Sequence, residues 1–150
     1  MSQQPSSRAL LLASGIAGLA SGGRSTLGPA VTRLSSKHSA WSRGLVLAGI
    51  ASELVVDKLP QTPSRLRLAP LAGRVAAGGL AGFQIARLGK APVVASTVAG
   101  AAAALAGSYA GNAWRQAWAR TGKPDLPAAL AEDAASIGLA YAASRVVTPS

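Results

Sequence analysis

The chain has 150 residues, of which 49% are hydrophobic but only 4% aromatic, so its apolar content is mostly Ala, Leu and Val beside 17 Gly. A soluble core of this size normally relies on Phe, Tyr and Trp for buried area, whereas small residues suit helices that approach closely in lipid. The net charge of +10 comes from Lys and Arg that punctuate the apolar segments without interleaved aromatics, which argues against nucleic-acid binding. With no Cys and a single His, the chain lacks the usual ligands of a transition-metal site and shows no catalytic triad. We therefore expect no metal, no cofactor and no enzyme activity.

The first apolar run covers residues 9–23 and follows a polar stretch, residues 1–8, that we expect to be disordered. The run is uncharged but shorter than the roughly 20 residues of a full membrane span. It stops at Gly22-Gly23-Arg24, resumes, and meets a second breaker at Gly28-Pro29. We predict a broken or re-entrant membrane segment here, with a signal peptide as the alternative.

The second apolar segment, about residues 40–57, contains two of the five acids, Glu53 and Asp57, and ends at a proline-rich loop. The third segment, residues 68–86, has Arg74 as its only internal charge. Both segments have the length and composition of membrane helices.

The fourth segment, residues 91–114, is uncharged and long enough for a full span, which makes it the strongest membrane signal in the sequence. Two Trp and several cations near its end indicate a membrane interface. The fifth segment, about residues 127–147, carries Glu132-Asp133. It follows Asp125, which we expect to cap the helix.

Five apolar segments without strand alternation predict an all-α fold, a polytopic helical membrane bundle with residues 9–150 as its single domain. A soluble Ala-rich helical bundle is the alternative. Basic loops are expected to contact anionic headgroups, and the cations divide evenly between the two sides, so the positive-inside rule gives no orientation. Small residues spaced four apart are expected to pack helices within the bundle, or between subunits of a homo-oligomer. The glycines of these pairs are Gly73, Gly78, Gly82, Gly107 and Gly111.

Charged residues inside or beside the apolar segments form the candidate functional set. A charge at the bilayer centre costs about 2.5–3.5 kcal/mol, so it is usually buried in protein and paired. Glu53 and Asp57 share one helix face and need a nearby cation; we expect Glu53 to face the interior and Asp57 the headgroups. The members are Arg24, Glu53, Asp57, Arg74, Arg115, Glu132 and Asp133. Two interpretations remain open: they line a polar interior for an ion, proton or solute, or they lock helix packing as ion pairs.

A weak internal similarity in the sequence suggests an inverted repeat. The first copy is a Gly-rich segment that ends in Arg24, followed by a helix that carries Glu53. The second copy is a Gly-rich segment that ends in Arg115, followed by a helix that carries Glu132. With one helix between the two pairs, the copies would have opposite orientation, as in many transporters. This hypothesis pairs Arg24 with Glu132 and Arg115 with Glu53.

Four motifs also resemble a known family: "GLASGGRSTLGP", "ELVVDKLPQTPSR", "GRVAAGGLAG" and the late "AED". They are similar to a family of small bacterial integral membrane proteins catalogued as a domain of unknown function, numbered four-one-two-six. The resemblance extends from about Ala9 to Val147. It implies a multi-pass location in the bacterial inner membrane and no established activity, cofactor or catalytic residue.

The sequence thus predicts a small integral membrane protein that acts as a channel or transporter-like module with a polar, charged interior. The alternative is an accessory subunit that packs in a larger membrane complex without transport activity.

Overall fold

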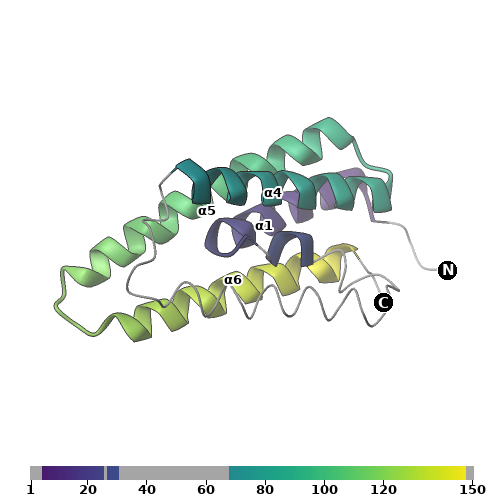
Figure 1. The fold of residues 1–150 in the computed structure, drawn as a ribbon. Coiled ribbons are helices and arrows are strands. Elements are labelled where there is room, and N and C mark those ends of the chain that lie inside the picture. Colours follow the sequence, from purple (N-terminus) through teal and green to yellow (C-terminus); the bar gives the residue numbers. More distant parts are fainter. Residues whose placement is uncertain (1–4, 26, 31–67, 148–150) are drawn as a thin grey trace, which may run out of the picture.

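A computed structural model describes residues 5–25, 27–30 and 68–147, and every regular element in these ranges is helical (Figure 1). The elements are α1 (Ser7–Gly23), α4 (Leu68–Gly89), α5 (Val93–Ala119) and α6 (Asp125–Val147). The all-α prediction is therefore confirmed for the first, third, fourth and fifth segments. The second segment, with Glu53 and Asp57, lies outside the described residues.

Helix α1 begins earlier than the sequence suggested. The hydroxyl of Ser6 accepts a hydrogen bond of 3.2 Å from the amide of Ala9 and caps the helix. Because serine is a favoured N-cap residue, Ser7 and Arg8 are helical, although they were expected to belong to a disordered terminus. The helix ends at Gly23, as the breaker Gly22-Gly23-Arg24 predicted.

After α1 the backbone changes direction at Arg24, which is extended at φ −142° and ψ 119°. The amide of Arg24 still bonds to the carbonyl of Ala20 at 2.9 Å, and its own carbonyl accepts from the amide of Leu27 at 3.1 Å. Residues 27–30 are helical again. The first segment is thus a broken helix with Arg24 at the break.

Helices α4 and α5 form an antiparallel hairpin whose backbones nearly touch. The turn uses Lys90 in the left-handed region, at φ 55°. A Cβ on Gly78 would lie 2.5 Å from the carbonyl oxygen of Gly100, and a Cβ on Gly82 would collide with the carbonyl of Ser96. Only glycine allows this approach, as expected for these two positions.

Helix α1 packs against the α4–α5 hairpin through the same kind of close contact at glycines. A Cβ on Gly18 would collide with the carbonyl of Gly100, and a Cβ on Gly107 would lie 2.7 Å from the carbonyl oxygen of Leu19. The buried face of α5 is a stripe of small residues spaced four apart: Ser96, Gly100, Ala104 and Ser108.

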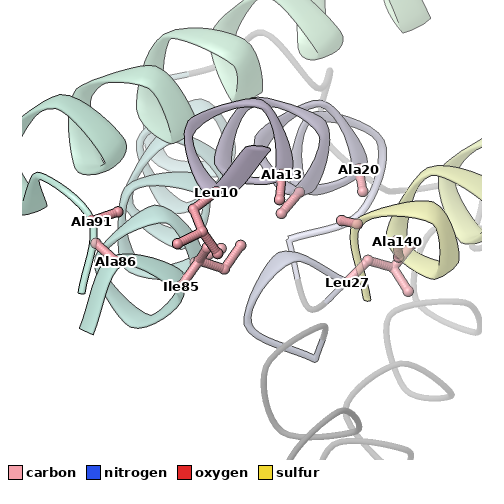
Figure 2. Close-up of a cluster of buried hydrophobic side chains, with 11 residues drawn as sticks. Leu10, Ala13, Ala20, Leu27, Ile85, Ala86, Ala91 and Ala140 are labelled. Carbon is pink, nitrogen blue, oxygen red and sulfur yellow. The ribbon is translucent and has the colours of Figure 1, made fainter. Parts of the chain in front are cut away.

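In the described helices, small side chains are buried and large apolar side chains are mostly exposed, the reverse of a soluble bundle. Among the described residues, the buried hydrophobic cluster contains three large side chains, Leu10, Leu27 and Ile85, among many alanines (Figure 2). Large apolar side chains lie mostly outside: Val94 is 77% exposed and Leu130 is 53% exposed. The other exposed ones include Leu12, Leu80, Leu88, Val98, Leu126, Ile137 and Tyr141.

The start of α1 and the end of α6 lie on the same side of the bundle. Figure 1 shows the start of α1, the α4–α5 turn and the end of α6 at the same side, and the α5–α6 turn at the other. Helix α6 packs mainly against α1 and much less against α5, so α5 and α6 diverge from their turn. In the part of the chain described here, one helix, Val93–Ala119, is long and apolar enough to cross a membrane.

Candidate functional site

The break in α1 places Arg24 against α6. Nε of Arg24 donates to Oδ1 of Asp133 at 3.0 Å, and Nη2 donates to the same oxygen. The Arg24 side chain is only 3% exposed and that of Asp133 12%. In such a buried pair, a direct contact replaces the lost hydration of the two charges. Removing either partner therefore lowers the free energy of unfolding strongly.

A second charged contact joins α5 and α6. Nη2 of Arg115 donates to Oδ2 of Asp125, and Nη1 of Arg115 is 3.7 Å from Oε2 of Glu132. The Asp125 side chain is 63% exposed, whereas that of Glu132 is 9% exposed. Arg115 thus hydrogen-bonds an acid at the surface and faces a buried one at a distance too long for a hydrogen bond.

The divergence of α5 and α6 leaves a cavity of about 400 Å³ beside these charges. Leu19 and Gly23 of α1 contribute to its wall, together with small and apolar residues of the other two helices. Its polar lining comes from Glu132 and Ser136 on α6, and its aromatic lining from Trp114 on α5. The cavity is therefore largely apolar, with one carboxylate.

Two indoles join α5 to the start of α6. Nε1 of Trp114 donates to the carbonyl of Ala128 at 3.3 Å, and Nε1 of Trp118 donates to the carbonyl of Pro124 at 2.9 Å. The two ring centroids are 5.7 Å apart, and Nζ of Lys123 is 5.7 Å from the centroid of Trp118. These bonds fix the Trp114 ring at the cavity wall. They also gather Trp and cations at this end of the bundle, as the sequence indicated.

Arg74 lies apart from these pairs. It is 5% exposed and continues the buried stripe of α4 that contains Gly78 and Gly82. Its Nη1 has no hydrogen-bond partner, and we find no ion pair for it among residues 5–25, 27–30 and 68–147. The structure therefore buries Arg74, as expected, without joining it to the other charges.

The charged residues predicted from the sequence are partly brought together. Arg24, Arg115, Glu132 and Asp133 all lie at the junction of α1, α5 and α6. The inverted-repeat hypothesis paired Arg24 with Glu132, whereas Arg24 contacts Asp133 and Glu132 faces Arg115. Its other pair joins Arg115 to Glu53, which lies outside the described residues. One residue along α6 is a rotation of about 100°, so the two neighbouring acids point to different partners.

Only some of the glycines that were predicted to pack helices lie at close helix contacts. Gly78, Gly82 and Gly107 lie at close helix contacts, but a Cβ on Gly73 would meet nothing within 4 Å. Gly73 is on the exposed side of α4, so it does not serve the contact predicted for it. Gly111 is half-buried and lines the cavity.

Sequence reasoning missed several residues of the site and its supports. Gly18, Gly22 and Gly100 make close helix contacts, and the hydroxyl of Ser108 bonds the carbonyl of Gly22 at 3.2 Å. The signal was present, since Gly18 and Gly22 are four apart. The contact of Asp125 with Arg115 had no local sequence signal, because it depends on the angle between α5 and α6.

Comparisons with known protein families, curated proteins and solved structures find no match for this chain. The family resemblance of the motifs stays a prediction.

Proposed function

We propose that the chain is an integral membrane protein of helical hairpins, with α5 as a full span and the broken α1 as a re-entrant or incomplete one. The proposal is supported by the inverted distribution of side-chain size. A water-soluble fold gains stability by burying Leu, Val and Ile, whereas this bundle buries Ala, Gly and Ser and turns its larger side chains outward. Close packing of small residues is how helices associate in lipid, where apolar surface gains nothing from burial.

The positions of the charges support the same placement. Residues 91–114 carry no charge, and cations follow at each end: Arg87 and Lys90 before α5, and Arg120 and Lys123 after it. With 27 residues, α5 is roughly 40 Å long, about the thickness of a bilayer with its headgroups. Basic ends then contact anionic headgroups.

We further propose that the junction of α1, α5 and α6 is the centre of a transporter-like module. The observation that supports this is the convergence of a broken helix end, a buried ion pair and a cavity at one place. Transporters place solute sites at broken helices, where polar groups are held inside the membrane. The Arg24–Asp133 pair would then be the closed form of a contact that opens when solute passes.

The alternative is an accessory subunit without transport, and one observation favours it. Arg24 and Asp133 are in direct contact and buried, as expected of an ion pair that locks α1 to α6. In that case the exposed small and apolar faces would serve a larger membrane complex.

Two experiments separate these proposals. Membrane integration is measured by carbonate extraction of membranes that contain the full chain, and release of the protein would contradict it. Transport is measured by flux of protons, ions and small solutes in liposomes, comparing the natural chain with Asp133→Asn. A flux that the substitution alters supports the transporter-like module, whereas no flux together with stable co-purification of a partner supports the accessory subunit.

A further inference from the structure

We infer that the cavity between α5 and α6 holds one acyl chain of an anionic phospholipid, whose headgroup lies at the cations of the α5–α6 turn. The inference deepens the proposed function, because it rests on the placement of the chain in a membrane, but it does not require transport. The lipid needs no contact with an acidic side chain, so the ion pairs at the junction stay as they are.

The walls of the cavity suit a hydrocarbon chain. Small and apolar side chains line most of it, among them Leu19 of α1 and Leu139 of α6. The acid in the wall, Glu132, already faces Arg115, and a polar solute would leave its own groups without hydrogen bonds against the remaining walls. The volume of about 400 Å³ is in the range of small-molecule sites. An acyl chain would give these walls the dispersion contacts that an empty space cannot.

The position of the cavity along α5 matches one leaflet of a bilayer. Its wall on α5 begins at Gly107, near the midpoint of the 27-residue helix, and continues to Trp114. At about 1.5 Å per residue this wall covers roughly 10 Å of helix, and Arg120 lies roughly 9 Å further along. With α5 spanning the bilayer as proposed, the cavity runs from the midplane towards one headgroup layer. An acyl chain follows the same course.

A row of aromatic and basic side chains leads from the cavity to the α5–α6 turn. Trp114 lines the cavity, and its ring centroid is 5.7 Å from that of Trp118. Nζ of Lys123 is in turn 5.7 Å from the Trp118 centroid. Because indole rings collect at the level of the headgroups, Lys123 is placed where the phosphate of a lipid in this cavity would lie.

The charge of the headgroup follows from the same turn. Arg120 and Lys123 are exposed, and neither forms an ion pair with another residue in the part of the chain that the structure describes. Asp125, the acid that follows them, accepts a hydrogen bond from Arg115. Cations beside an anionic headgroup favour its binding. An anionic lipid should therefore bind more tightly than a zwitterionic lipid with the same acyl chains.

The test is the quenching of Trp fluorescence in the natural chain, held in maltoside micelles. Phosphatidylglycerol and phosphatidylcholine with the same brominated acyl chains are titrated separately, because bromine quenches an indole that it approaches closely. We expect saturable quenching by both lipids, with phosphatidylglycerol binding at least about ten-fold more tightly. Quenching that rises with lipid content without saturating, or equal affinity for the two lipids, overturns the inference.

Two variants of α6 locate the acyl chain. Ala135→Phe and Ala134→Phe add the same ring, but Ala135 lines the cavity, whereas Ala134 is exposed and outside it. Ala135→Phe should abolish the saturable quenching by both lipids. Ala134→Phe should leave both affinities within about two-fold. Circular dichroism checks that each variant is folded, and saturable quenching that survives in folded Ala135→Phe contradicts the site.

Two double variants locate the headgroup. Arg120→Gln with Lys123→Gln should remove most of the preference for phosphatidylglycerol and leave the affinity for phosphatidylcholine unchanged. Arg87→Gln with Lys90→Gln removes the same charge near the α4–α5 turn, at the other end of the bundle (Figure 1), and should keep the preference. An equal loss of preference in both would trace it to net charge and would refute a headgroup site at the α5–α6 turn.

Carbonate extraction distinguishes failure of this site from failure of the proposed function. A chain that resists extraction but shows no saturable lipid binding is a membrane protein without the site, so the inference alone fails. Release of the chain by carbonate contradicts the membrane placement, and the lipid site then fails with it.

Discussion

Arg24 and Asp133 are 109 residues apart in sequence, yet Nε of the first donates to Oδ1 of the second at 3.0 Å inside the bundle. This contact joins the broken end of α1 to the middle of α6. Both side chains are nearly excluded from solvent. Among the charged contacts of the described residues, stability should therefore depend most on this one.

Asp133→Asn should destabilise the protein by about 3–5 kcal/mol, because it removes the charge of the buried carboxylate that Arg24 contacts. Urea unfolding in detergent micelles measures the change. The exchanged double variant Arg24→Asp with Asp133→Arg should recover part of the loss. A single variant as stable as the natural chain would show that the pair contributes nothing.

Asp125→Asn should lower stability by less than about 1 kcal/mol, although it also removes the partner of an arginine. Its carboxylate is 63% exposed, and exposed pairs are screened by water and offset by side-chain entropy. The same unfolding assay applies. A loss as large as that of Asp133→Asn would contradict the distinction drawn from burial.

Gly82→Ala should destabilise the α4–α5 hairpin by roughly 1–3 kcal/mol, because the added methyl collides with the carbonyl of Ser96 and forces the helices apart. Gly73→Ala is the matched control on the same helix. Its methyl meets nothing within 4 Å, and alanine should stabilise α4 by up to about 1 kcal/mol. Equal effects of the two substitutions would refute the close contact.

Leu105→Lys tests the outward face near the middle of α5. Leu105 is 40% exposed, so a soluble bundle would tolerate lysine there with little change. In a membrane the same change costs about 2.5–3.5 kcal/mol of insertion free energy, and the share of carbonate-resistant protein should fall. Thr121→Lys, in the α5–α6 turn, is the control and should insert normally.

Much of the fold could be predicted because its signals are local. The uncharged run 91–114 predicted α5, which continues to Ala119 because Trp114 and Arg115 still find partners on α6. The breaker at Gly22-Gly23-Arg24 predicted the end of α1. These features depend on residues adjacent in sequence.

The site was less predictable, because its partners are set by rotation and crossing of helices. Sequence placed Glu132 and Asp133 together, but only the orientation of α6 decides that Asp133 faces Arg24 and Glu132 faces the cavity. The cavity itself comes from the divergence of α5 and α6. No single residue encodes that angle.

The distance along the chain between Arg24 and Asp133 also sets an order of events during synthesis. At about 5–20 residues per second, the ribosome adds Asp133 roughly 5–20 s after Arg24, so the break in α1 exists for that time without its carboxylate. Helix α1 can therefore form its contact with α6 only after α6 has been synthesised. A chain stopped before α6 would retain α1 and the sequence of the α4–α5 hairpin but lack the contact between Arg24 and Asp133.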